Sequence, residues 1–408
     1  MECRIRGYIF IDHNFVPGEV KYNDGIITEV NVLGEPSNSE PSNSEPSNSE
    51  HLLSDDERDN YIIPGLVDIH MHGCMGVDLC DCAKEGLTDE NINEIIGKMV
   101  EYERSVGVTS ICPTTMTLDE DSLSAIMRAV GEYEDNSGAL AGVHLEGPFI
   151  SYDKRGAQNP KYIKLPDVAL VKRLNELSRG MVRLVTVAPE AEGAFEFIRT
   201  LTGQAERANE KAERANEQTQ SHIRCSLAHT TADYDIAMEA IKAGADHVTH
   251  MYNAMPPFLN RAPGVVGAAF DAKSTYVELI CDGIHVHPSV VRATFEMFGA
   301  DRIVLISDST EATGMPDGKY ALGGQTVYKQ GSLATLVDGT IAGSATNLFD
   351  CMKMAIKIGI PREDAITAAT FNPAKSLGLE HRVGSIAVGK EAKLIVCDQN
   401  LNLKRVIS

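Results

Sequence analysis

The pattern of hydrophobic positions repeats one rhythm through the central part of the chain, from Tyr61 onward. Short runs of apolar, often β-branched residues alternate there with longer stretches whose apolar residues recur at helical spacing. Apolar runs of this kind are typical of parallel strands that are buried on both faces. Eight such strands are predicted, at Gly65–His70, Val108–Pro113, Leu140–Leu145, Val182–Val187, Arg224–Ala228, His247–His250, Tyr276–Ile280 and Arg302–Ile306.

Helical spacing fills most of the intervals between these strands. The clearest predicted helices are Asp89–Val106, Ser122–Tyr133, Pro166–Leu177, Ser344–Ile358 and Arg362–Thr370. Eight strands that alternate with helices over about 300 residues predict an α/β fold, a (β/α)8 TIM-like barrel. We place this barrel at residues 64–377.

The two ends of the chain follow a different pattern, in which short β-like runs are separated by turn signals. Before the barrel these runs are Arg4–Ile11, Gly18–Tyr22 and Gly25–Val32, and after it they are Gly384–Lys390 and Ala392–Cys397. We expect residues 1–63 and 378–408 to form one small β domain, which would bring the two ends of the chain together.

Two repeat tracts interrupt these patterns. Residues 36–50 are three copies of Pro-Ser-Asn-Ser-Glu, a polar tract with nothing to bury, and we expect a disordered surface loop. Residues 204–218 repeat an alanine-containing heptad twice. Two heptads are too few for a stable coiled coil, so we expect an inserted, projecting helix without a catalytic role.

Composition narrows the classes of function. The chain has 408 residues and a formal net charge of −21, which argues against a nucleic-acid or anionic-membrane binder, although a local cation could still bind a small anion. It has no apolar run of 18 residues, and Met1–Phe10 lacks a signal-peptide core, so we expect a cytoplasmic protein. Its nine cysteines lack framework spacing and fit reduced thiols.

The first predicted barrel strand ends in candidate metal ligands. The stretch Pro64–Gly73 closes on His70 and His72, which are separated by one residue. Side chains two residues apart in a strand point to the same face, so the two imidazoles can converge on one point. Converging imidazoles suit a transition metal such as zinc or iron. Taken alone, the pair is equally compatible with two histidines at a strand end that bind no metal.

Ionisable side chains also stand at the carboxyl ends of other predicted strands. Glu146 follows the third strand, His229 the fifth and Asp308 the eighth, while His250 ends the sixth. In (β/α)8 barrels the active site lies at this end. Singly, each is more often a structural polar residue, but together with the first strand they predict a metal site.

Five segments together resemble a known enzyme family: Pro64–Gly73, His144–Phe149, Thr249–Met255, Asp282–His285 and Ser307–Asp308. Their order and spacing resemble the N-acetylglucosamine-6-phosphate deacetylases of the amidohydrolase superfamily, over nearly the whole chain apart from the repeat tracts. The resemblance implies a (β/α)8 barrel with a β-sandwich built from both chain ends, and a homodimer. It further implies metal-dependent hydrolysis of N-acetyl-D-glucosamine 6-phosphate to D-glucosamine 6-phosphate and acetate, in amino-sugar catabolism.

The resemblance also implies roles for the candidate ligands. Glu146, His229 and His250 would hold a main divalent metal, with zinc or iron expected. His70 and His72 would hold a second metal, with Glu146 as the bridge. Some relatives lack this histidine pair and use one metal, so one or two metals per chain are expected. The fourth predicted strand ends without a lysine, which separates the chain from dihydroorotase-like enzymes that bridge two metals with a carboxylated lysine.

Asp308 is the candidate catalytic base. A metal lowers the pKa of bound water toward about 7 and polarises a carbonyl group, which an unreactive acetamide requires. Asp308 could then take the proton from the water and pass it to the departing nitrogen. The alternative is that Asp308 only caps the loop after the eighth strand.

The resemblance assigns eight residues to the substrate: Gln158, Asn253, Ala254, Arg261, His285, Ala345, Thr346 and Asn347. Among them, the planar fork of Arg261 suits a phosphate. The segment Gly343–Asn347 would wall the acetyl end of the pocket. Gln158 stands where some relatives carry a histidine that hydrogen-bonds the substrate carbonyl, and it cannot supply a positive charge. Our hypothesis is that a second metal replaces that electrophile.

Three alternatives remain open at this point. The substrate could be the galactosamine epimer, because the metal centre does not sense the configuration at C4. It could also be another N-acyl compound. A metal-free scaffold protein is disfavoured because all the expected ligand positions are filled.

Overall fold

The computed structural model describes residues 2–33, 53–203 and 223–408. The two repeat tracts, at 36–50 and 204–218, lie outside these described residues, and so do the loop and helix expected there. No helix among the described residues has the length and apolar character needed to span a bilayer.

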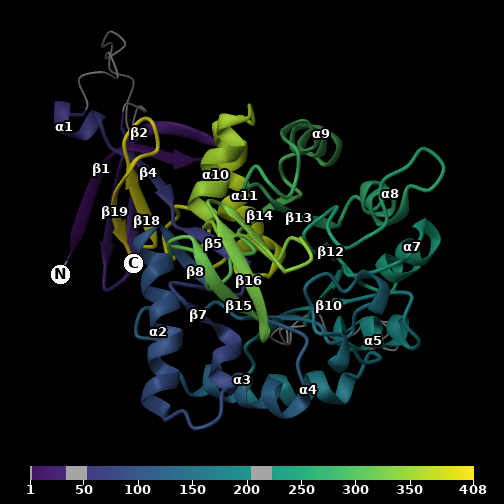
Figure 1. Ribbon diagram of the computed structural model, residues 1–408. Helices are drawn as coiled ribbons and strands as arrows, with labels where there is room; N and C mark the ends of the chain where they lie inside the picture. The colour runs from purple at the N-terminus through teal and green to yellow at the C-terminus, as the bar shows by residue number, and fades with distance from the viewer. Residues whose placement is uncertain (1, 34–52, 204–222) are drawn as a thin grey trace, which may run out of the picture.

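Eight parallel strands form the central sheet (Figure 1). In sheet order they are β5 (Leu66–Met71), β8 (Val108–Thr115), β9 (Val143–Glu146), β10 (Val182–Val187), β11 (Arg224–Leu227), β12 (His247–Val248), β13 (Tyr276–Ile280) and β14 (Ile303–Ile306). Just beyond β14, the N–H of Asp308 donates to the carbonyl oxygen of His70 at 2.9 Å, so the first and last strands meet. The predicted (β/α)8 barrel is therefore confirmed, with all eight strands in place.

Helices cover the outside of the barrel (Figure 1). They include α2 (Asp89–Ser105), α3 (Glu120–Glu132), α4 (Val168–Leu177), α5 (Ala194–Leu201), α7 (Tyr234–Lys242), α8 (Gly264–Asp271), α9 (Pro288–Phe298), α10 (Leu348–Lys357), α11 (Arg362–Ala369) and α12 (Phe371–Ser376). Thr88 and Asp119 start α2 and α3 by accepting a hydrogen bond from a backbone N–H of the first turn. The predicted helix from Ser344 begins later, at Leu348, because Asn347 is the residue that caps α10.

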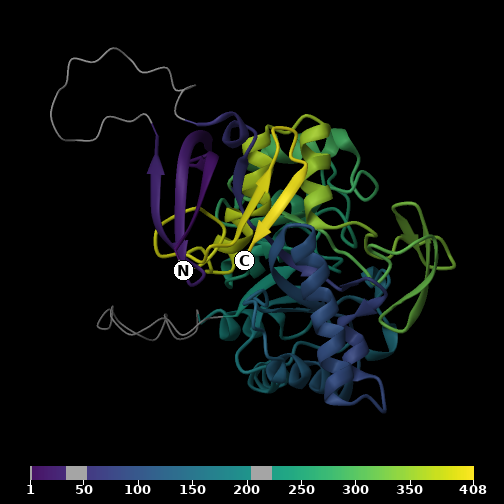
Figure 2. The ribbon, with the colours of Figure 1, turned by 90° about the vertical axis from the view of Figure 1, so that its left-hand side faces the viewer.

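Strands from both ends of the chain form a second sheet, on the left of Figure 1 and facing the viewer in Figure 2. Its order is β19 (Leu403–Ile407), β18 (Leu394–Cys397), β4 (Tyr61–Pro64), β1 (Cys3–Ile11), β2 (Asn14–Asn23) and β3 (Ile26–Val32). The expected union of the two chain ends in one β domain is thus confirmed. The domain boundaries at 63/64 and 377/378 stay predictions.

One predicted terminal strand is wrong. Residues 384–390 adopt turns, because Gly384 and Gly389 have positive φ angles, of 86° and 87°, that interrupt an extended run. The Nζ of Lys390 closes this segment by donating to the Oγ of Ser385 at 2.6 Å.

A three-stranded antiparallel sheet that the sequence analysis did not predict follows the last barrel strand. It consists of β15 (Gly318–Leu322), β16 (Gln325–Gln330) and β17 (Leu333–Thr335), and projects on the right of Figure 2. Leu322, Val327 and Ala334 bury one of its faces against Met116, which follows β8. The sheet therefore covers part of the carboxyl end of the barrel.

Candidate active site

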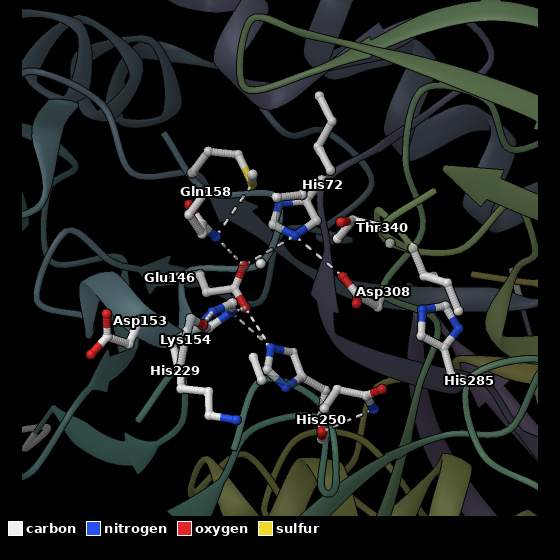
Figure 3. A pocket seen from close by; sticks show the side chains of 18 residues that line it. His72, Glu146, Asp153, Lys154, Gln158, His229, His250, His285, Asp308 and Thr340 are labelled. Carbon is white, nitrogen blue, oxygen red and sulfur yellow. Dashed lines mark hydrogen bonds and ion pairs between the residues drawn. The ribbon is translucent and has the colours of Figure 1, made fainter. Parts of the chain in front are cut away.

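The five predicted metal ligands meet at the carboxyl end of the barrel, and Figure 3 shows four of them, His72, Glu146, His229 and His250. The carboxylate of Glu146 lies at their centre. Its oxygens are 3.6 Å from Nε2 of His70, 3.3 Å from His72, 3.2 Å from His229 and 2.9 Å from His250. All five side chains are buried. Four imidazoles thus direct the same ring nitrogen at one carboxylate.

The donors that converge on this point fall into two adjoining groups. Glu146, His229 and His250 form one, and His70, His72 and Asp308 form the other. A third buried group behind His70 consists of His70, His144 and Glu278. The Oδ1 of Asp308 is 3.4 Å from Nε2 of His70 and 3.2 Å from Nε2 of His72. Nε2 of His229 and of His250 are only 3.1 Å apart. Because lone pairs converge here at contact distance, the donor set fits a divalent transition metal.

Backbone carbonyls orient two of these imidazoles. Nδ1–H of His72 donates to the carbonyl oxygen of Thr114 at 3.2 Å, and Nδ1–H of His229 donates to that of Lys154 at 2.8 Å. A carbonyl oxygen can only accept, so each ring carries a proton on Nδ1 and directs Nε2 at the centre, where loss of an Nε2 proton would free a lone pair for a metal.

The backbone is strained where the strands end. His229, His250 and Asp308 have φ angles of 45°, 32° and 50°, in the left-handed region that side-chain-bearing residues seldom adopt. Such strain costs of order 1–3 kcal/mol per residue and persists only where surrounding structure enforces it. Three strained residues that meet at one point are a typical mark of a functional site.

Both carboxylates of the centre are ionised at neutral pH. Burial alone would raise the pKa of Glu146, but the surrounding imidazoles, His70 foremost, hold it well below its ordinary value. Burial likewise opposes ionisation of Asp308, and His70 and His72 bring its pKa below the usual range. Asp308 can therefore accept a proton.

A cavity of about 310 Å³ opens above this centre. Nine of the residues that the sequence analysis named line it: His72, Glu146, Gln158, His229, His250, Asn253, Ala254, His285 and Asp308. This volume lies at the small end of the range for ligand pockets, as a compact substrate requires. His70 lies beneath the cavity floor and does not line it.

Comparison with known proteins identifies the family of this chain. Residues 61–408 match the model of the amidohydrolase family. The chain belongs to the amidohydrolases.

Named relatives narrow the position of this amidohydrolase within the family. It is 37% identical to N-acetylglucosamine-6-phosphate deacetylase of Bacillus subtilis (strain 168), an alignment that covers 83% of this chain and 81% of the relative. It is 32% identical to N-acetylgalactosamine-6-phosphate deacetylase of Escherichia coli O157:H7, with 87% and 88% covered.

A solved structure has the same fold as this chain over its whole length. A mutant of N-acetyl-D-glucosamine-6-phosphate deacetylase from Mycobacterium smegmatis, in complex with N-acetyl-D-glucosamine-6-phosphate, superposes with a TM-score of 0.83 at 28% identity. The superposition covers 100% of this chain and 97% of that one.

Gln158 is fixed against the centre of the amidohydrolase. Its Nε2 donates to Oε2 of Glu146 at 2.8 Å, and its Oε1 accepts from the N–H of Thr117 at 2.7 Å. Both ends of the buried amide are thus held, with one N–H of the Nε2 group turned to Glu146. The role of Gln158 toward a substrate carbonyl stays a prediction.

Four of the residues assigned to the substrate lie outside the cavity lining. Arg261 is exposed on the loop after β12. Of the segment Gly343–Asn347 expected at the acetyl end, Gly343 lines the cavity beside Thr340 and Ile341. Asn347 caps α10 by accepting from the N–H of Asp350 at 2.9 Å. The substrate roles of Arg261, Ala345, Thr346 and Asn347 stay predictions.

Two residues with evident contacts to the site were missed by the sequence analysis. Lys154 lines the cavity, with Nζ 3.4 Å from the carbonyl oxygen of Met255, but nothing in the sequence separates it from a surface lysine. Glu278 lies 3.0 Å from Nδ1 of His70. The sequence did contain a sign of this contact, because a single carboxylate inside the apolar strand Tyr276–Ile280 requires a partner.

His285 faces the cavity as a second candidate cation. Burial alone would lower its pKa, but the hydrogen bond between its Nδ1 and Oδ2 of Asp282, at 2.7 Å, raises the pKa above the ordinary value. The imidazole can therefore carry a positive charge near neutral pH, which suits an anionic ligand.

Gly343 allows the close packing of the loop that carries Asp308, and Gly343→Ala tests this packing. Its φ is +57°, and an added Cβ would lie 2.6 Å from Cγ2 of Thr310 and 2.9 Å from the carbonyl oxygen of Asp308. We expect the free energy of unfolding to fall by about 2–4 kcal/mol, from backbone strain and overpacking together.

Denaturant unfolding measures this effect. The matched control is Gly339→Ala, where φ is +87° but no atom lies within 4 Å of the added Cβ, so only backbone strain is introduced. Equal losses in the two variants would show that the contact with the Asp308 loop is unimportant.

Proposed function

We propose that this amidohydrolase hydrolyses the acetamide of N-acetyl-D-glucosamine 6-phosphate to D-glucosamine 6-phosphate and acetate. The observation that carries the proposal is the convergence of four imidazoles and Asp308 around Glu146, at and just beneath the floor of a cavity that Lys154 also lines. The named relatives and the solved structure with N-acetyl-D-glucosamine-6-phosphate support the choice of substrate.

The centre would hold one or two divalent metals, zinc or iron. Glu146, His229 and His250 would bind the first, and His70 and His72, with Glu146 between them, would bind the second. When bound, such metals lower the pKa of water and polarise the amide carbonyl.

Asp308 would carry the proton during the reaction. Its carboxylate is ionised, lines the cavity and is held by His70 and His72. It can accept the proton of the attacking water and deliver it to the amide nitrogen, which then leaves as an amine. Without that delivery, the leaving group would be an amide anion.

Lys154 and His285 would bind the 6-phosphate together with the Asn253–Ala254 backbone. Nζ of Lys154 reaches Met255, so it lies beside that backbone inside the cavity. Arg261 is exposed on the same loop, a position that suits contact with the substrate of a partner in a homodimer. The enzyme would be cytoplasmic, and the net charge of −21 supports a protein that binds neither nucleic acid nor anionic membranes.

Lys154→Met tests this phosphate site. A charged hydrogen bond contributes about 1.5–3 kcal/mol, so KM for N-acetyl-D-glucosamine 6-phosphate should rise by about 10- to 100-fold with a smaller change in kcat. Steady-state kinetics would show this, and kcat/KM for unphosphorylated N-acetylglucosamine should stay the same.

The matched control is Arg155→Met, which removes the neighbouring cation. Arg155 lies over the ring of Tyr152, with 4.5 Å from its Cζ to the ring centroid, and does not line the cavity. An equal rise in KM in both variants, or an equal loss with the unphosphorylated substrate, would contradict a specific role of Lys154.

Acetate release tests the function as a whole. The purified protein would be supplied with Zn²⁺ or Fe²⁺ and assayed with N-acetylglucosamine 6-phosphate, its galactosamine epimer and an N-acetyl amino acid. We expect the highest kcat/KM with the first and loss of activity with a chelator. The relative from Escherichia coli supports the epimer as the second candidate, and a higher kcat/KM with it would replace the main proposal.

A further inference from the structure

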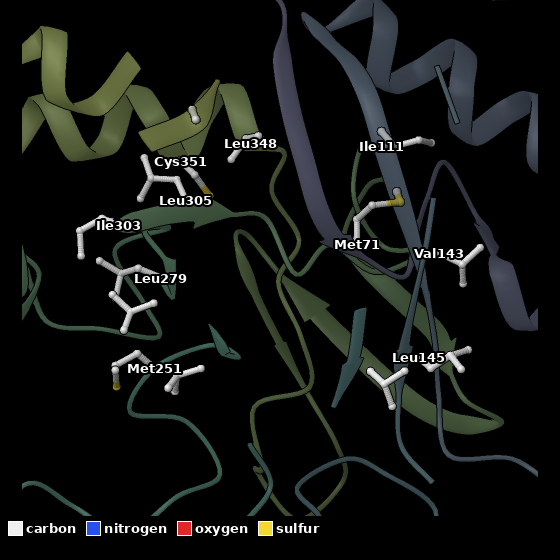
Figure 4. Packing of buried hydrophobic residues seen from close by; sticks show 14 of the residues in the cluster. Met71, Ile111, Val143, Leu145, Met251, Leu279, Ile303, Leu305, Leu348 and Cys351 are labelled. Atoms are coloured by element: carbon white, nitrogen blue, oxygen red, sulfur yellow. The ribbon is translucent and has the colours of Figure 1, made fainter. Parts of the chain in front are cut away.

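Glu278 is a buried carboxylate for which the proposed reaction has no use. It lies in β13, between Val277 and Leu279, and its side chain is completely buried. Successive side chains of a strand point to opposite faces, and Leu279 packs into the apolar core (Figure 4), so Glu278 points away from this core. Burying an ionised carboxylate costs several kcal/mol unless a charge or a hydrogen bond compensates.

His70 supplies that partner. Oε2 of Glu278 lies 3.0 Å from Nδ1 of His70, and in the described part of the chain this is the one ion pair recorded for Glu278. Its other oxygen, Oε1, has no hydrogen-bond partner among the described residues. His144 packs against the same imidazole, with 4.6 Å between ring centroids. The ring of His70 is thus held both by packing and by a charged acceptor.

This contact sets His70 apart from the other oriented ligands. Nδ1 of His72 and of His229 faces neutral backbone carbonyls, whereas Nδ1 of His70 faces a carboxylate. A carboxylate behind an imidazole keeps the proton on Nδ1 and makes Nε2 a stronger ligand. Nε2 of His70 is buried without a hydrogen-bond partner and is directed to the centre.

The charges around the centre lead to the same conclusion. Glu146 and Asp308 provide two negative charges, which balance a single divalent cation. Glu278 adds a third carboxylate, next to the one group of donors that the second metal would use. A second divalent cation held by His70 and His72 would therefore lie next to this carboxylate.

We propose that Glu278 is a positioning residue that acts through His70 and determines whether the His70–His72 half of the centre retains a second metal. This inference rests on the proposed metal-dependent function. It predicts that the affinity for the second metal, and not for the first, depends on the charge of Glu278.

Metal titration of Glu278→Gln tests the inference. The amide keeps the size and an acceptor oxygen but removes the charge, so the Kd of the second metal should rise by about 10- to 100-fold, while the Kd of the first stays the same. At limiting Zn²⁺, elemental analysis should give two metals per wild-type chain and one per Glu278→Gln chain. If the Gln variant does not fold, Glu278→Asp, which keeps the charge one methylene further away, should show an intermediate Kd.

The matched control is Glu103→Gln. Glu103, on α2, is also completely buried and has no hydrogen-bond partner for either oxygen among the described residues, and burial raises its pKa well above the ordinary value. Because Glu103 belongs to none of the donor groups among the described residues, Glu103→Gln should leave both metals bound. In a His70→Ala background, Glu278→Gln should have no further effect on metal content, whereas a merely structural role would lower it again.

Three results would overturn the inference: two metals retained with unchanged affinity in Glu278→Gln, an equal loss of both metals, or a wild-type chain that holds one metal at every concentration. The acetate-release assay on the wild-type chain separates this inference from the proposed function. A chain that binds two metals but releases no acetate would refute the function and leave the role of Glu278 supported.

Discussion

Replacing Asp308 with asparagine should lower kcat for acetate release by about 10³-fold, within the range that a positioned general base contributes. Asparagine has nearly the same shape but cannot accept the proton of water or deliver it to the amide nitrogen. KM should change little, because Lys154 and the Asn253–Ala254 backbone still bind the phosphate. Steady-state kinetics with N-acetylglucosamine 6-phosphate measures both parameters.

Metal content must be measured in the same samples, since Oδ1 of Asp308 also lies 3.2 Å from Nε2 of His72. The control is Asp246→Asn, which removes a carboxylate next to Arg224 and His247, just before β12 and away from the centre. That variant should lose stability without losing kcat. A normal kcat in Asp308→Asn would exclude Asp308 as the base, and a loss explained by missing metal would reduce it to a ligand.

Replacing Glu146 with alanine should remove metal from the whole centre. Its two oxygens contact Nε2 of all four histidines, so both groups of donors lose their shared anion. Polarisation by metal contributes several kcal/mol, and kcat/KM should therefore fall by about 10³-fold or more. Elemental analysis should find less than one metal per chain.

His72→Ala provides the contrasting case. It should lower the metal content to one per chain and retain part of the activity, because the donors Glu146, His229 and His250 remain. The control is His247, a buried histidine that contacts Asp246 outside the centre. His247→Asn should keep its full metal content. Retention of two metals by Glu146→Ala would contradict the bridging role.

The barrel was predictable because its strands are buried on both faces. Val182–Val187 and Tyr276–Ile280 have the predicted bounds, since a continuous apolar run allows few other structures. The strand ends then indicated the site, because all parallel strands of a barrel end at the same face. His229 and Asp308 line the same cavity for this reason, although Asp308 lies 79 positions further along the chain.

The parts that were missed depend on contacts that no local pattern records. Gly318–Leu322 has no apolar run, because β15–β17 expose much of their surface to solvent. The sheet is held on the barrel by Leu322, Val327 and Ala334, which pack on the distant Met116. The loop after β12 turns through left-handed residues, Tyr252 and Ala254, with φ angles of 77° and 50°. Residue spacing along the sequence does not predict such a backbone path. The path of this loop places Arg261 outside the cavity.

The position of β4 within the terminal sheet determines the order in which the protein can fold during synthesis. β4 pairs in parallel with β1 on one side and antiparallel with β18 on the other, so its second edge stays unpaired until residues 394–397 have left the ribosome. Unpaired edges invite aggregation. The domain that is begun first is therefore completed last, and a chain that stops before Leu394 would carry a finished barrel beside an open, aggregation-prone sheet.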